Sequence, residues 1–222
     1  KRGPPDSARA FIHPDALPST PFPNIESHSH DGIDSAVARL NLAIRKHESV
    51  CVWGDFDVDG QTSTALLVQT LRAIDAKVVY YIPIRGKESH GVHIESLKPI
   101  LDNGATLIIT CDTGITAHTA IDYANSRGVD VIVTDHHDLG ESLPNAKAII
   151  NPKMLSEDHP LANLAGVGVA YKFAEALLNS EGRRQKAEGR RRIADSTDLL
   201  DLVALGLIAD VALLKGETRS LA

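Results

Sequence analysis

One stretch, residues 50–60, constrains the fold more than any other part of the sequence. Val50 to Trp53 are apolar, as expected of a buried strand, and three aspartates follow at alternate positions before Gly60. Apolar residues then recur with helical spacing over residues 61–71. The pattern predicts a strand, an acidic loop and a helix. Because ligands of open α/β sheets collect beyond the carboxyl ends of the strands, we expect the acidic loop to form half of a metal site.

The three aspartates Asp55, Asp57 and Asp59 repel one another unless a cation is bound, which favours this interpretation. Two alternatives compete with it. The same spacing begins an EF-hand loop, but the twelfth position must then be a bidentate glutamate and is Leu66 here. An EF-hand also needs a helix before the loop, where this sequence predicts a strand. On this stretch alone, an acidic surface turn without a metal stays open.

Two further predicted strands end in residues of the same chemistry. The strand over residues 106–111 is followed at once by Asp112, and the strand over residues 129–133 leads into Asp135-His136-His137. If the strands are parallel, their carboxyl ends meet at one edge of the sheet. One such cluster arises easily by chance, whereas three at the same topological position do not.

The remaining elements complete an α/β fold with an open, mostly parallel sheet and helices on both faces. Further helices are predicted over residues 29–47, 94–101, 116–127, 164–178 and 199–207, and further strands over residues 77–84 and 148–150. Residues 1–28 lack periodicity and are expected to be an extended arm, with one domain over residues 29–222. His28 and His30 are interpreted as solvated residues rather than ligands, and the basic run over residues 180–192 as a solvated loop rather than a nucleic-acid contact.

Composition limits the class of protein. No apolar run approaches the roughly 20 residues that span a bilayer, and no signal peptide is visible, so we expect no membrane contact and a cytoplasmic location. The two cysteines, Cys51 and Cys111, lie in or beside apolar runs and are predicted to be buried thiols. The net charge of −6 argues against a broad DNA-coating surface, but it leaves open a nucleic acid held by metals in a local groove.

The predicted ligands are four carboxylates and one imidazole, namely Asp57, Asp59, Asp112, His136 and Asp210. This mixture suits Mn²⁺ or Mg²⁺ better than structural Zn²⁺. Because five protein ligands exceed what one Mg²⁺ usually takes, we expect two ions that share a carboxylate. No serine or cysteine nucleophile with a partnered base is evident, so the expected reaction is attack of an activated water on a phosphoryl group.

Other residues around these ligands are expected to support the reaction. His137 is predicted to donate to the phosphoryl oxygens, and Asp135 to orient His136. Four residues are candidates for substrate binding: Arg85, His90, Gly166 and Gly168. A plain surface loop and tight helix packing stay open as alternatives for these four.

At these residues the chain resembles the DHH phosphoesterase superfamily, which is named for the triplet Asp135-His136-His137. Residues 54–60 and 164–170 are similar to those of the RecJ-type single-strand-specific DNA exonucleases. The resemblance runs from about residue 30 to the end of the sequence and covers four motifs in family order. It implies two Mn²⁺ or Mg²⁺ ions with Asp112 as the bridging ligand. Asp55 is counted among the catalytic residues but not among the ligands. The implied reaction is 5′→3′ removal of nucleotides from single-stranded DNA in repair or recombination.

Two features depart from the relatives. RecJ-like enzymes carry a C-terminal DHH-associated domain with a Gly-Gly-His motif that this sequence lacks, so we expect a fragment or a shortened relative that another domain or partner protein completes. Manganese pyrophosphatases of the superfamily place a histidine four residues before the first ligand aspartate. That position is Trp53 here, which disfavours a pyrophosphatase.

Two alternative functions share this fold. One is a phosphodiesterase for a short oligonucleotide or cyclic dinucleotide, in which only the substrate groove differs. The other is a non-catalytic scaffold, like the degenerate superfamily member in the eukaryotic replicative helicase. Degenerate members lose metal ligands, whereas this chain has an acid or histidine at every expected position, which favours an enzyme.

Overall fold

The computed structural model describes residues 19–24, 32–187 and 196–222. Within them the chain forms a five-stranded, all-parallel open sheet in the order β2-β1-β3-β4-β5. The strands are β1 (Ser49–Trp53), β2 (Val78–Tyr81), β3 (Ala105–Cys111), β4 (Asp130–Thr134) and β5 (Ala148–Ile150). The predicted α/β class is therefore confirmed.

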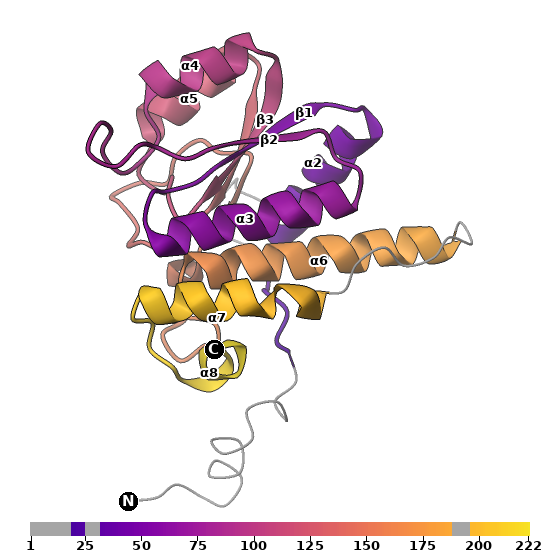
Figure 1. Ribbon diagram of the computed structural model, residues 1–222, viewed down its shortest axis with the longest axis vertical. Helices are drawn as coiled ribbons and strands as arrows, with labels where there is room; N and C mark the ends of the chain where they lie inside the picture. The colour runs from indigo at the N-terminus through magenta and orange to yellow at the C-terminus, as the bar shows by residue number, and fades with distance from the viewer. Residues whose placement is uncertain (1–18, 25–31, 188–195) are drawn as a thin grey trace, which may run out of the picture.

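Helices cover both faces of the sheet (Figure 1). They are α2 (Ile33–Arg45), α3 (Val58–Ala73), α4 (Ile94–Asp102), α5 (His118–Ser126), α6 (Gly166–Ala187), α7 (Leu200–Ala209) and α8 (Gly216–Leu221), with short 3₁₀ turns over Pro152–Met154 and Ser196–Leu199. Successive side chains of a strand point to opposite faces. In β3, accordingly, Leu107 and Ile109 pack in the core under α2, α3 and α6, and Ile108 packs in the core under α4 and α5.

The three central strands are buried on both sides, which explains why the sequence reads as continuous apolar runs there. Cys51 and Cys111 are free thiols within these cores, as predicted. Since all strands run the same way, the loops that follow Trp53, Cys111, Thr134 and Ile150 emerge at one edge. This edge is where the acidic and histidine motifs lie.

Helix α6 differs from the prediction. It was expected to end near Leu178 and continues to Ala187, so residues 180–187 of the basic run are helical rather than a loop. Gly182 weakened the helical signal, but a single glycine costs only about 1 kcal/mol against alanine. The glutamate, glutamine, lysine and alanine around it are strong helix formers. The rest of the basic run, and His28 and His30, lie outside the described residues.

Of the predicted N-terminal arm, residues 19–24 are described and lie against the domain. Phe22 belongs to the core, and the Thr20 N–H donates to the Glu217 carboxylate of α8 at 2.8 Å. Fully buried Lys172 of α6 also contacts Glu217, and its Nζ lies 2.8 Å from Ser19 Oγ. One buried ammonium thus ties the two ends of the described chain to α6.

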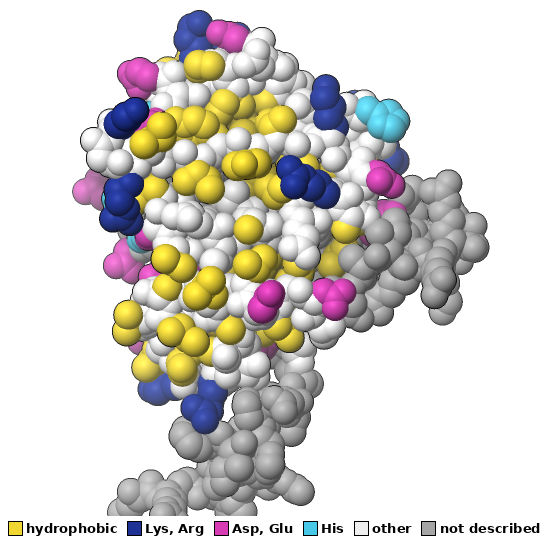
Figure 2. Space-filling view, in the orientation of Figure 1, with side chains coloured by type: hydrophobic (Ala, Val, Ile, Leu, Met, Phe, Trp, Pro, Cys, Tyr) yellow, Lys and Arg dark blue, Asp and Glu magenta, His cyan; other side chains and the backbone are white. Residues whose placement is uncertain are grey.

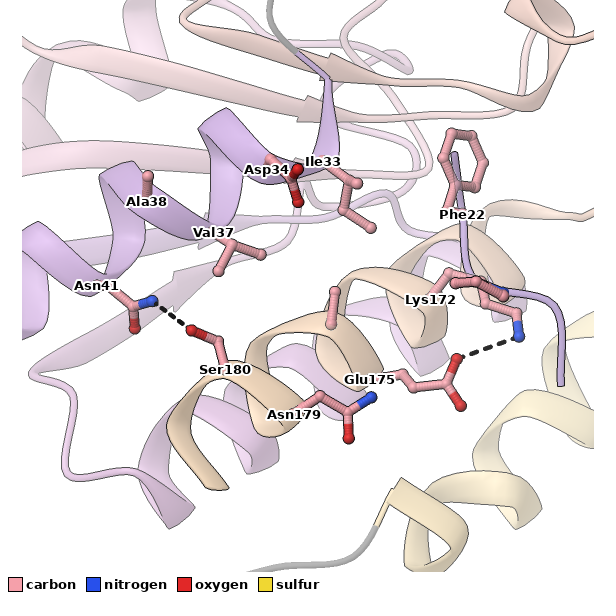
Figure 3. A pocket seen from close by; sticks show the side chains of 12 residues that line it. Phe22, Ile33, Asp34, Val37, Ala38, Asn41, Lys172, Glu175, Asn179 and Ser180 are labelled. Carbon is pink, nitrogen blue, oxygen red and sulfur yellow. Dashed lines mark hydrogen bonds and ion pairs between the residues drawn. The ribbon is translucent and has the colours of Figure 1, made fainter. Parts of the chain in front are cut away.

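A cavity of about 650 Å³ lies beside this cluster, between α2 and α6 (Figure 3). Phe22, Ile33 and Val37 give it an apolar wall, and a hydrogen bond of 3.1 Å from Asn41 to Ser180 crosses one end. None of the predicted site residues lines it.

Helix α7 packs on α3 and α6 through Val203 and Leu207, which are fully buried. Its other side is exposed, with Leu205 at 54% and Ile208 at 62%, and Figure 2 shows hydrophobic side chains gathered over α3 and α7. Among the described residues, no helix is both long and apolar enough to cross a membrane.

Candidate metal centre

The strand ends bring the predicted metal ligands together. His136, after β4, places Nε2 3.0 Å from Asp112 Oδ1, after β3, and 3.7 Å from Asp59 Oδ2. Asp210, at the end of α7, joins Asp59 and His136 in a group whose ligand atoms all lie within 4.8 Å of one another. Four of the five predicted ligands therefore converge, from three different motifs and a helix end.

Asp59 is held by the start of α6. Its two carboxylate oxygens accept the N–H groups of Gly166 at 2.7 Å and Val167 at 2.8 Å. A helix N-terminus presents unpaired N–H groups and a partial positive charge, and both favour a carboxylate there. Burial nevertheless raises the pKa of Asp59, and the nearby charge of Asp210 raises it further.

Asp57 takes a different position from the other predicted ligands. It caps α3, and its Oδ1 accepts the Gly60 N–H at 2.9 Å. The group of possible ligands that contains Asp57 includes Asp55 and His90 rather than Asp112. Its charge still acts on Asp112, whose pKa it raises, so Asp57 borders the converged group.

Asp112 is the buried carboxyl at the centre of the site. Its φ is +58°, a conformation that non-glycine residues seldom adopt and that clusters at functional sites. Its Oδ1 is buried, and although it lies at ion-pair distance from His136, it has no hydrogen bond within the described residues. Burial, with repulsion from Asp59 and Asp57, raises the pKa of Asp112 to about 10.

These features fit a divalent cation. A buried carboxylate oxygen without a hydrogen bond is costly unless something compensates it. Several carboxylates and one imidazole are oxygen-rich donors of the kind that Mn²⁺ and Mg²⁺ accept. The converged group is therefore a candidate metal centre on its own chemistry.

Asp135 contacts the ring of His137 rather than the ring of His136, which it was expected to orient. Its Oδ1 lies 2.7 Å from His137 Nδ1, and it accepts the His136 and His137 backbone N–H groups at 2.7 and 3.1 Å. Its Oδ2 accepts the Ile115 N–H at 2.9 Å. Burial acts to raise the pKa of Asp135, but these hydrogen bonds outweigh it and hold the pKa below its ordinary value.

His137 is held by Asp135 and faces solvent. Its side chain is 60% exposed, compared with 17% for His136. The hydrogen bond to Asp135 raises the pKa of His137 to about 9. The two histidines thus differ in environment: one ring points into the carboxylates and the other toward solvent.

Asp55 anchors a second, more exposed group. Its buried carboxylate lies 2.9 Å from His90 Nδ1. The His90 ring lies 4.1 Å from the Phe56 ring, and the Arg85 guanidinium lies 4.6 Å from the Phe56 ring centre. Arg85 and His90 are therefore exposed together beside the acidic loop, while Phe56 is nearly buried between them.

Gly166 and Gly168, which are predicted to contact substrate, pack closely against neighbouring residues. Both are buried. A Cβ on Gly166 would lie 2.6 Å from the Asp112 Cβ, and a Cβ on Gly168 would lie 2.7 Å from the Leu164 side chain. The absent side chain at Gly166 lets α6 begin directly against Asp112.

The sequence analysis missed two groups that hold residues of the triplet 135–137 in place. The Ile115 N–H, three residues after Asp112, reaches the Asp135 carboxylate. Asn151, directly after β5, donates from Nδ2 to the His137 carbonyl at 3.0 Å. Asn151 follows a strand at the same sheet edge as the aspartates, and this position was the available signal. The residue types could not indicate the Ile115 N–H, because it is a backbone group.

The fold is that of the DHH family. The description "DHH family, N-terminal domain" matches residues 49–207, and the chain belongs to this family. The match begins at β1 and ends in α7, so it contains the whole converged group except Asp210.

The names of individual relatives are more specific than the description of the family. The chain is 40% identical to the single-stranded-DNA-specific exonuclease RecJ of Bacillus subtilis over 218 residues, which are 98% of this chain and 25% of that protein. A crystal structure of exonuclease RecJ bound to manganese has a TM-score of 0.76 and 35% identity over 92% of this chain and 48% of that one. A RecJ structure with Mg²⁺ from Thermus thermophilus has a TM-score of 0.56 and 29% identity over 98% of this chain and 26% of that one. The chain thus spans a quarter to a half of the length of these relatives.

Proposed function

We propose that this chain is the metal-binding domain of a 5′→3′ exonuclease for single-stranded DNA that works with two Mn²⁺ or Mg²⁺ ions. The convergence of Asp59, Asp112, His136 and Asp210 beyond the strand ends supports the proposal most directly. The substrate comes from the relatives, which are named as single-stranded-DNA-specific exonucleases. Two of the similar structures are named for bound manganese and magnesium.

In this proposal, Asp59, Asp112, His136 and Asp210 would hold the ions together with Asp57, and Asp112 would be the ligand that both ions share. When bound, the ions supply Lewis-acid polarisation of the phosphoryl group and lower the pKa of a water molecule. Bound cations would offset the burial and the repulsion between carboxylates that together raise the pKa of Asp112.

His137 acts on the substrate from the outer side of the centre. The hydrogen bond to Asp135 raises the pKa of His137, which favours an imidazole with a proton to donate. Asp135 holds Nδ1, which leaves Nε2 for a phosphoryl oxygen on which charge develops. Arg85 and His90 are the exposed cationic and imidazole groups that would contact the DNA chain beside the ions.

The activity test uses a 5′-labelled single strand of about 30 nucleotides with Mn²⁺, with the matching duplex as comparison. We expect release of labelled mononucleotide from the single strand and little from the duplex. Faster hydrolysis of a dinucleotide than of the long strand would point to a small-nucleotide phosphodiesterase instead. No hydrolysis of either substrate with Mn²⁺ or Mg²⁺ would contradict catalysis by this chain.

The Asp112→Ala variant tests the assignment of the centre. We expect loss of turnover with a retained fold, because removing the shared carboxylate disturbs both ions while it relieves repulsion among the remaining acids. Circular dichroism would verify the fold. Wild-type rates with Mn²⁺ in this variant would show that Asp112 is not a ligand.

A further inference from the structure

Asn151 is fully buried at the point where β5 ends, beside the triplet 135–137. Its side chain is held at both ends. Nδ2 donates to the His137 carbonyl at 3.0 Å, and Oδ1 accepts the Lys153 N–H at 2.8 Å and so caps the 3₁₀ turn Pro152–Met154. A fully buried side chain touches neither substrate nor solvent, so any effect on the reaction must pass through these contacts.

The same strand end holds the triplet through its backbone. The Asp135 N–H donates to the Ile150 carbonyl at 3.1 Å, in continuation of the pairing of β4 with β5. Asp135 fixes the His137 ring and backbone N–H, and Asn151 fixes the carbonyl of the same residue. The position of His137 is therefore determined from two sides, by its own loop and by the neighbouring strand.

We infer that Asn151 is a positioning residue that acts through His137. This inference rests on the proposed function, in which His137 donates to the phosphoryl group. Without the Nδ2 bond, the His137 carbonyl loses its tie to β5 and the loop over residues 135–138 is free to shift. A displacement of about 1 Å in a catalytic group is enough to cost on the order of 100-fold in rate. The amide supplies both the donor to the His137 carbonyl and the acceptor for the Lys153 N–H.

A double-mutant cycle tests the inference, with Asn151→Ala and His137→Ala alone and together. We expect Asn151→Ala to lower kcat about tenfold or more while KM changes less than about threefold. In the His137→Ala background the same change should lower kcat no further, because the residue it acts through is gone. An equal loss of kcat in both backgrounds would overturn the inference.

Two further variants separate positioning from general stability. Asn125→Ala removes a more exposed amide-to-carbonyl bond, from Asn125 Nδ2 to the Asn145 carbonyl at 2.7 Å, away from the candidate centre, and should leave kcat unchanged. Asn151→Asp keeps an acceptor for Lys153 and loses the donor to His137. If Asn151 only caps the 3₁₀ turn, this variant recovers wild-type kcat, and if it positions His137, kcat stays low.

Amide hydrogen exchange provides a readout that needs no activity. We expect faster exchange at His136 and His137 in Asn151→Ala and Asn151→Asp, and no change there in Asn125→Ala. Unchanged exchange in the Asn151 variants would overturn the inference even if the chain hydrolyses DNA. If wild-type protein fails to hydrolyse DNA, the proposed function fails, while the exchange result still decides whether Asn151 holds the loop.

Discussion

Asp112 is a carboxyl group buried among other carboxylates, and its raised pKa has a definite consequence for stability. In the unfolded chain it releases its proton near pH 4, whereas in the metal-free folded chain it keeps the proton to about pH 10. The unfolded state therefore binds fewer protons over this window, and the group makes folding less favourable as the pH rises from 4. Asparagine has a similar shape and does not titrate.

We therefore expect Asp112→Asn in a chelator to be more stable than wild type at pH 7, by more than about 1 kcal/mol, since one pKa unit corresponds to about 1.4 kcal/mol. The difference should shrink toward zero at pH 4. Urea unfolding at several pH values measures it. A variant that is less stable than wild type at pH 7, or a difference independent of pH, would contradict this account of Asp112.

Substitution of the two histidines of the triplet is expected to have different effects on Mn²⁺ binding and on turnover. His136 lies among Asp112 and Asp59, so His136→Ala should weaken Mn²⁺ binding about tenfold or more. His137 is mostly exposed and is held by Asp135, so His137→Ala should leave Mn²⁺ affinity within about twofold and lower kcat by about 10²–10³-fold. Calorimetric Mn²⁺ titration and single-turnover hydrolysis measure the two effects. Equal losses of affinity in both variants would contradict the division of roles.

At the scale of elements, the start of α6 couples the glycine-containing motif to the metal ligands. Gly166→Ala would place a Cβ 2.6 Å from the Asp112 Cβ and 2.7 Å from Oδ1, so the helix start or Asp112 must move. We expect a loss of stability of about 1–3 kcal/mol, as in other overpacked cores, together with weaker Mn²⁺ binding. Thermal unfolding with and without Mn²⁺ measures both.

Gly182→Ala is the matched control on the same helix. A Cβ there meets nothing within 4 Å, so alanine should stabilise the chain by about 0.5–1 kcal/mol through its better helix propensity and leave Mn²⁺ binding unchanged. If Gly166→Ala behaved like Gly182→Ala, the close contact between α6 and Asp112 would not matter to the site.

The strands and loops also show which parts of the fold and of the candidate site could be predicted from the sequence. The apolar runs of β1, β3 and β4 are unambiguous because these strands are buried on both faces, and parallel order brings their terminal acids to one edge. The convergence of Asp112 and His136 followed from that rule. Which histidine Asp135 holds did not follow, because residues 136 and 137 are adjacent and only the loop geometry separates their rings. The packing of Gly166 on Asp112 joins positions 54 residues apart and left no local signal.

At the scale of the whole molecule, Lys172 joins segments from both ends of the described chain. Its ammonium is fully buried and contacts Glu217, with Glu175 at 3.2 Å and Ser19 at 2.8 Å. Removing one partner of a buried ion pair leaves an uncompensated charge, so we expect Lys172→Met to cost about 3–5 kcal/mol. Lys98→Met, which breaks an exposed pair with Asp102, is the control and should change stability far less. Similar melting temperatures for the two variants would contradict a stabilising role of the buried Lys172–Glu217 ion pair.

We propose that divalent ions bind among Asp57, Asp59, Asp112, His136 and Asp210. Crystals of the chain grown with Mn²⁺, with data collected at the manganese absorption edge, would locate these ions. We predict anomalous difference peaks between Asp112, His136 and Asp59, with Asp210 and Asp57 as further ligands and two ions about 3.5–4 Å apart. A map with no peak among these side chains, or with manganese only at Asp55 and His90, would contradict the account.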